Sequence, residues 1–163
     1  VPSALMQSMA SFVSQNIGAG KTKRAKKSMF TGIGVGLVVG CMVFLLVMLK
    51  GDMLAGFFTT DAAVIQKGYA YLKGFALETI VTAILFSMVG YFNGNNKTVW
   101  VMTHGLIQTL LVRLPFAYVM SIQPDASLTK IGLAAPVSTM VGIVLNVGFY
   151  IYLGKQEKKI SKK

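Results

Sequence analysis

The 163-residue sequence is 54% hydrophobic and only 13% charged, so an all-α integral membrane protein is expected and an ordinary soluble domain is excluded. Its net charge of +11 does not indicate nucleic-acid binding, because the basic residues lie in short clusters at the ends of apolar runs. The single cysteine, Cys41, lies inside an apolar run and offers neither a disulfide nor a metal site within this chain.

The first element is a moderately apolar segment rich in small residues, expected over residues 1–17 as the last part of a helix whose start precedes this sequence. Glycines at positions 18 and 20 end it, and a basic cluster follows at once: Lys21, Lys23, Arg24, Lys26 and Lys27. The positive-inside rule places this loop in the cytoplasm.

Residues 29–49 are an uncharged apolar run of 21 residues, long enough to cross a hydrocarbon core of ~30 Å. Gly32, Gly36 and Gly40 recur every four residues, which predicts close approach of a neighbouring helix. The glycines are not expected to bind a nucleotide, because they lie inside a span and not between a strand and a helix. Residues 50–67 are expected to form an external loop with a short interfacial helix.

The next span, expected over residues 69–92, carries Glu78 in its apolar run. At 1.5 Å per residue, Glu78 would lie roughly 13 Å along this helix, near the middle of a core of ~30 Å. An ionisable group at that depth costs at least about 2.5 kcal/mol, so it is expected to face a protein interior or a wet cavity and to mark an ion or substrate path.

Two further spans are expected, over residues 99–119 and 131–153, joined to the preceding helix by a Gly- and Asn-rich turn at residues 93–97. A basic tail follows at residues 155–163. The first loop, the turn and the tail hold eleven of the sixteen basic residues. Four complete spans and one partial span, within residues 1–154, therefore predict a multi-pass protein of the cell membrane with its C-terminus in the cytoplasm.

Two stretches and the helix spacing resemble the multidrug and toxic compound extrusion (MATE) family. The stretch SFVSQNIGAGKTKRAKK is similar to the family's Gln, Gly-Ala-Gly and basic loop after an even-numbered helix, and VGYFNGNNKT to the end of its tenth helix. The resemblance covers essentially the whole chain. It implies the end of helix 8 through helix 12 and the tail, in the C-terminal lobe of a transporter with two lobes of six helices.

This resemblance implies a secondary active antiporter that exports cationic or amphipathic organic compounds in exchange for Na⁺ or H⁺. Its partners would be the substrate, the lipid bilayer and the N-terminal lobe, with no cofactor and no nucleic acid. In the sodium-coupled bacterial branch an acid in the tenth helix helps to bind the cation, and Glu78 occupies the matching place. That family position is often Asp, so Glu78 leaves the choice between Na⁺ and H⁺ open.

The other polar residues of the spans have two interpretations. Uncharged side chains line the central cavity or form hydrogen bonds between helices, and the candidates are Gln7, Gln15, Thr79, Thr82 and Gln108. Arg113, before the kink expected at Pro115, is either an anchor at the helix end or a partner of Glu78 or of substrate. His104 lies close to the internal interface, which disfavours a proton relay.

Other functions stay open beside antiport. A flippase for lipid-linked precursors, in the same superfamily, would need several basic residues in its cavity, and only Arg113 and Lys73 are available. In a membrane subunit that transports nothing, Glu78 would be structural. No nucleophile with a base, metal-ligand cluster or phosphate-binding loop is visible, so an enzyme is not expected.

Overall fold

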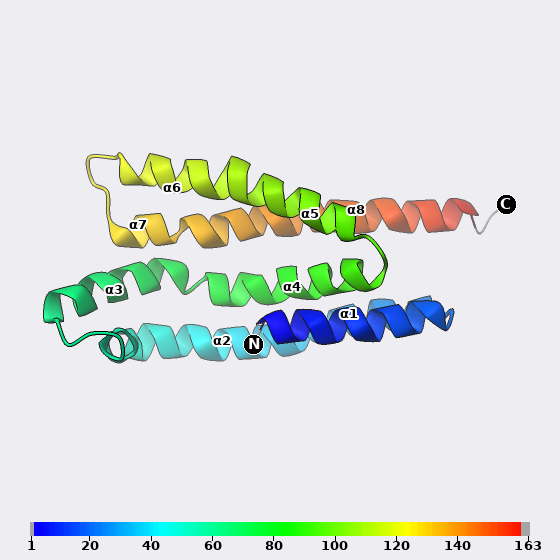
Figure 1. Ribbon diagram of the computed structural model, residues 1–163, viewed down its shortest axis with the longest axis horizontal. Coiled ribbons are helices and arrows are strands. Elements are labelled where there is room, and N and C mark those ends of the chain that lie inside the picture. The colour runs from blue at the N-terminus through cyan, green and yellow to red at the C-terminus, as the bar shows by residue number, and fades with distance from the viewer. Residues whose placement is uncertain (1, 161–163) are drawn as a thin grey trace.

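The computed structural model describes residues 2–160, which are helical throughout apart from short connections. The helices run roughly parallel and antiparallel to one long axis (Figure 1). In chain order they are α1 (Pro2–Gly18), α2 (Thr22–Gly56), α3 (Ala62–Phe75), α4 (Glu78–Gly94), α5 (Thr98–Leu106), the π-helix η1 (Ile107–Arg113), α6 (Leu114–Ser121), α7 (Leu128–Gly132) and α8 (Ala134–Ile160).

The turns lie at two opposite ends of the bundle. The α1–α2 turn, the α4–α5 turn and the end of α8 lie at one end, and the α2–α3 and α6–α7 loops lie at the other (Figure 1). The first end therefore holds the basic clusters that the sequence places on one side of the membrane. In the α4–α5 turn Asn96 adopts a φ of +57°, as the Gly- and Asn-rich sequence predicts.

Several spans differ in detail from the sequence prediction. By length and composition, α2 and the segment Leu128–Gln156 can each cross a membrane, and α3 with α4 can form a third span bent by 47°. The helix expected over residues 69–92 is therefore broken. The span expected over residues 99–119 is helical from Thr98 to Ser121 but contains η1. Pro115 offers no N–H to the preceding turn, which explains a widened helix at this place.

The helix α2 is longer than the predicted span. It begins inside the basic cluster and continues to Gly56 beyond a kink at Lys50, whose φ and ψ are −138° and 24°. The Tyr69 hydroxyl donates to the Met48 carbonyl at 2.9 Å beside this kink. The Tyr69 ring covers Gly51, where a Cβ would lie 2.5 Å from the ring. Part of the expected loop over residues 50–67 is thus a continuation of α2.

The glycine stripe of α2 packs on α4, as its spacing predicts. A Cβ on Gly40 would lie 2.5 Å from the Thr79 carbonyl oxygen, and one on Gly36 would lie 3.0 Å from the Cβ of Ala83. Next along, Gly32 faces Ser87. Small residues on both helices bring the two backbones together, which is a common source of helix association within membranes.

Aromatic side chains join α4, α5 and α8 near the basic end of the bundle. Trp100 stacks on Phe149 with ring centroids 4.2 Å apart, and its Nε1 donates to Oδ1 of the fully buried Asn146 at 3.0 Å. Phe92, also fully buried, packs edge-on against Phe149. Both partners of the Trp100 side chain, Phe149 and Asn146, are therefore supplied by α8.

Candidate functional site

Glu78 is the first residue of α4 and directly follows the break between α3 and α4. The prediction of a continuous helix around it is wrong. Across the break the Thr79 N–H donates to the Ala76 carbonyl at 3.1 Å and the Ile80 N–H donates to the Leu77 carbonyl at 3.2 Å. These tight turns satisfy backbone groups that a helix end would leave free. Glu78 is thus the acidic residue of the first turn of α4.

One oxygen of Glu78 is held from α8. Thr139 Oγ1 donates to Glu78 Oε1 at 2.9 Å, and Gln108 Nε2 in η1 donates to Thr139 Oγ1 at 3.3 Å. The sequence analysis proposed Gln108 and did not find Thr139. The contact joins residues 61 positions apart, so in the sequence Thr139 is visible only as a hydroxyl residue inside an apolar span.

The other oxygen has no such partner. Within residues 2–160, Glu78 Oε2 and Thr82 Oγ1 are the buried side-chain atoms that make no hydrogen bond. The Thr82 hydroxyl lies near the carboxylate and can donate toward it, but no well-formed hydrogen bond joins the two side chains. A buried oxygen without a hydrogen bond is costly, so this pair marks a place where a further group is needed.

Both oxygens belong to residues that line one cavity of about 350 Å³ between α1, α2 and α4. Its polar lining consists of Glu78, Thr79 and Thr82, and the rest is apolar, including Leu5 and Val39. The Thr79 hydroxyl is already engaged, since it donates toward the carbonyls of Gly40 and Ala76. Among the polar residues that line the cavity, Glu78 and Thr82 are therefore the two with a side-chain oxygen that makes no hydrogen bond.

Arg113 does not form an ion pair with Glu78. Its side chain is exposed at the end of η1 and acts on Glu78 only as a nearby charge. The ion pair between Lys130 and Asp125 lies elsewhere, at the α6–α7 loop. A structural pairing of Glu78 with Arg113 is therefore absent from this arrangement.

The remaining candidates lie away from this site. Gln7 and Gln15 are exposed on α1 and are not among the cavity-lining residues. His104 is 2% exposed, stacks beside Trp100, and places Nδ1 3.3 Å from the Trp100 carbonyl oxygen. Of the predicted residues, the fold brings together Glu78, Thr79, Thr82 and Gln108.

Comparisons with known proteins agree with this fold. A family model described as MatE matches residues 1–119. A solved structure described as the inward-facing conformation of a multidrug resistance MATE family transporter of the MOP superfamily is similar, with a TM-score of 0.80 and 15% identity. The match covers 92% of this chain and 36% of that one, so the chain spans about a third of that transporter's length. A search of curated proteins found no match.

Proposed function

Because this chain belongs to the MATE family of membrane transporters, we propose that it is part of a secondary active antiporter in which Glu78 binds the coupling cation. The transporter exports cationic or amphipathic organic compounds in exchange for Na⁺ or H⁺. The multidrug resistance transporter of similar fold supports this substrate class. The basic clusters at one end of the bundle support a cytoplasmic C-terminus.

The observation that carries the proposal is the buried Oε2 of Glu78, which has no hydrogen bond and belongs to a cavity-lining residue. A purely structural carboxylate would be paired or fully hydrogen-bonded. An oxygen left without a partner is instead available to a cation that comes and goes. Either Na⁺ binds to hard oxygen atoms, or desolvation favours the neutral acid and the carboxyl carries a proton.

Charge competition at this site would couple the two transport steps. A cation on Glu78 neutralises the carboxylate, whereas an empty site leaves a negative charge beside an apolar cavity. A cationic substrate is attracted to the empty, negatively charged state, whereas the loaded, neutral state offers no such attraction. These interactions are strong where water is scarce. Exchange follows if each ligand favours a different arrangement of the two lobes, as in other transporters built from repeats.

The flippase alternative gains no support from the geometry. Lys73 Nζ lies over the Tyr69 ring, 4.3 Å from its centroid, and Arg113 is exposed. Neither is a lining residue of the cavity that holds Glu78. The basic groups that a pyrophosphate would need are therefore not gathered at this cavity.

The experiment is ethidium efflux from proteoliposomes that hold the full-length protein, under an imposed Na⁺ or proton gradient. Export should follow one gradient and fall to the uncoupled rate in Glu78→Gln. Asp52→Asn, which neutralises an exposed carboxylate on α2, is the matched control and should behave as wild type. Gradient-driven export at the wild-type rate in Glu78→Gln contradicts the proposal. Absence of efflux under both gradients would also contradict it, and lipid translocation would then be assayed.

A further inference from the structure

The two oxygens of the Glu78 carboxylate have different surroundings. Oε1 accepts a hydrogen bond of 2.9 Å from Thr139, whereas Oε2 is buried without one. Thr139 is itself fully buried on α8, so bulk water does not compete for its hydroxyl. One carboxylate oxygen is therefore fixed to α8, and the other is free to bind.

Gln108 sets the direction of the Thr139 hydroxyl. Its Nε2 donates to Thr139 Oγ1, and a hydroxyl that accepts from an amide still has its single hydrogen to donate, here to Glu78 Oε1. Gly142 leaves room for this arrangement, since a Cβ there would lie 3.0 Å from the Gln108 Cδ. The hydrogen bonds thus run one way, from η1 through α8 to α4.

Thr82, which lines the same cavity, has a second side-chain oxygen that makes no hydrogen bond. Two other hydroxyls of α4 are engaged, that of Thr79 with the Gly40 and Ala76 carbonyls and that of Ser87 with a carbonyl of its own helix. The buried Thr82 Oγ1 makes no well-formed hydrogen bond to the described residues. Thr82 lies one turn after Glu78 on the same face. Two neighbouring oxygens with free lone pairs suit a small cation, either Na⁺ bound to both or a proton on Oε2 that donates to the hydroxyl.

We propose that Thr139, held by Gln108, is a positioning residue that ties Oε1 of Glu78 to α8, so that the coupling cation is received between Oε2 and the Thr82 hydroxyl. This inference rests on the proposed role of Glu78 in coupling and adds which oxygen binds and which residues orient it. The nearby charge is Arg113 from η1. The residues that α1 and α2 contribute to the cavity, such as Leu5 and Val39, are uncharged.

The test is the half-saturating concentration of the driving cation for ethidium efflux, measured together with the maximal rate in the full-length protein under Na⁺ and proton gradients. Thr139→Val keeps the side-chain shape and removes the hydroxyl, and it should raise the half-saturating concentration about tenfold. Thr139→Ser should restore it. Ser138→Ala is the matched control, because this neighbouring buried hydroxyl bonds only to its own helix, at the Ala135 carbonyl, and its half-saturation should not change.

Two further variants keep the proposal testable. Gln108→Leu should shift half-saturation in the same direction as Thr139→Val but by less, and it replaces Thr139→Val if that protein does not fold. Thr82→Val should weaken a Na⁺ dependence strongly and a proton dependence only slightly, because a hydroxyl coordinates Na⁺ but merely accepts a hydrogen bond from a protonated carboxyl.

The outcomes separate this inference from the proposed function. Wild-type half-saturation in both Thr139→Val and Gln108→Leu, or equal impairment in Thr139→Val and Thr139→Ser, overturns the positioning role. An unchanged half-saturating concentration in Thr82→Val under the driving gradient would contradict the role of the Thr82 hydroxyl in binding the cation. If Glu78→Gln loses coupling while one of these results is found, the positioning inference is contradicted and the proposed function is still supported. If Glu78→Gln still couples export to the gradient, both the inference and the proposed function are contradicted.

Discussion

Thr79 shares its hydroxyl hydrogen between the carbonyl oxygen of Gly40, at 3.1 Å, and that of Ala76, at 2.7 Å. The contact with Gly40 joins the helix that carries Glu78 to α2. The approach needs a glycine, since a Cβ at position 40 would lie 2.5 Å from the Thr79 carbonyl oxygen and 3.1 Å from the Ile80 Cα. Both atoms belong to the backbone of α4, so a side chain here can be accommodated only if a helix moves. The same contact therefore helps to set the position of α4 along α2 and the rotation of α4 about its axis, and with them the position of Glu78.

Gly40→Ala should destabilise the protein by about 1–3 kcal/mol, the usual cost of overpacking a close contact. Thermal unfolding in detergent measures this change. Gly34→Ala on the same helix is the matched control, because a Cβ at Gly34 meets nothing within 4 Å. Equal melting temperatures for Gly40→Ala and wild type would show that the two helices do not pack as described.

Gly142→Ala should act on the site through Gln108. The new methyl group occupies the space of the Gln108 carboxamide, so Gln108 must turn away from Thr139 and the Thr139 hydroxyl loses its direction. We expect a higher half-saturating cation concentration, in the direction of Gln108→Leu, with little change in melting temperature because the side chain is flexible. Gly148→Ala, where a Cβ meets nothing within 4 Å, should leave both quantities unchanged.

Asn146→Leu should loosen the contact between α5 and α8. It removes the acceptor of the Trp100 N–H and leaves that donor buried, which costs about 1–3 kcal/mol. Trp100 is the only tryptophan in the sequence, so its fluorescence emission reports the change directly. Val144→Ala, at an exposed position of the same helix, is the control. An unaltered emission spectrum in Asn146→Leu would contradict the described packing of the indole.

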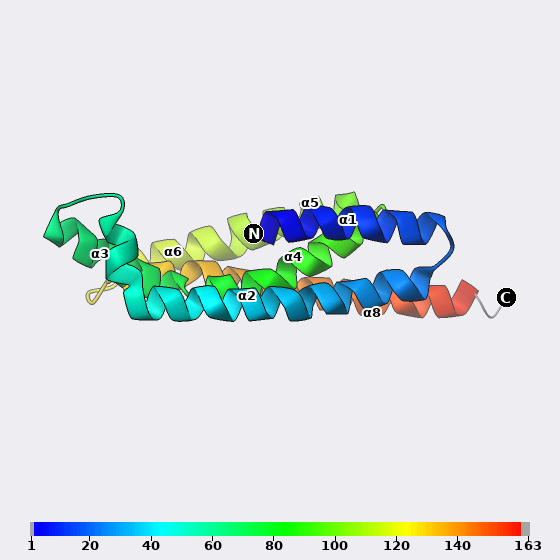
Figure 2. The ribbon, with the colours of Figure 1, turned by 90° about the horizontal axis from the view of Figure 1, so that it is seen from below.

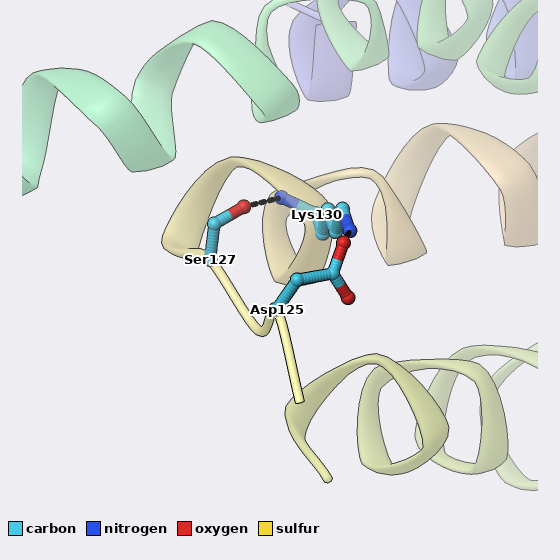
Figure 3. Close-up of polar contacts among 3 residues, drawn as sticks. All are labelled: Asp125, Ser127 and Lys130. Carbon is cyan, nitrogen blue, oxygen red and sulfur yellow. Dashed lines mark hydrogen bonds and ion pairs between the residues drawn. The ribbon is translucent and has the colours of Figure 1, made fainter. Parts of the chain in front are cut away.

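The α6–α7 loop predicts a pH dependence outside the membrane. The Lys130 ammonium donates to the Asp125 carboxylate, while Ser127 Oγ accepts from the Lys130 N–H at 3.2 Å (Figure 3). The hydrogen bond and charge of Lys130 hold the pKa of Asp125 below its usual range. This interaction is complete above the ordinary carboxyl pKa and is lost as the pH falls through the lowered value.

Carboxyl NMR of the labelled protein in micelles should therefore give Asp125 a pKa below that of a free aspartate. Lys130→Gln should return it to the ordinary value, and high salt should move it part of the way because the pair is exposed. Ser127→Ala, which removes only the N-cap of α7, should leave the pKa of Asp125 low. A pKa in Lys130→Gln equal to that of wild type would contradict the pairing.

Figure 2 shows the bundle from the side, with α1 and α2 lying next to each other and the α3 end turned away from the main axis. The bend between α3 and α4 is held by a close crossing at this end. Glycines on both helices allow it: a Cβ on Gly132 would lie 2.7 Å from the Tyr71 carbonyl oxygen, and one on Gly74 would clash with the Thr129 carbonyl oxygen. The Thr129 hydroxyl donates to the Ala70 carbonyl at 2.7 Å. The break before Glu78 therefore lies beside a close crossing of α3 and α7.

The sequence by itself determined the membrane class, the basic clusters that fall at one end, the glycine stripe of α2 and the candidacy of Glu78. Each of these depends on hydropathy, charge or spacing along one helix, and such local patterns are visible without a fold. Resemblance of the quoted motifs also indicated the family that the comparisons confirm.

The tertiary structure alone decided where the helix breaks and which oxygen of Glu78 stays free. Thr139 reaches Glu78 across 61 residues of sequence, and the break at Ala76 and Leu77 lies beside a crossing with α7 that no local pattern encodes. Packing decides these features because a hydrogen bond between helices needs both depth and rotation to match. In an apolar span a threonine alone looks like any other small residue.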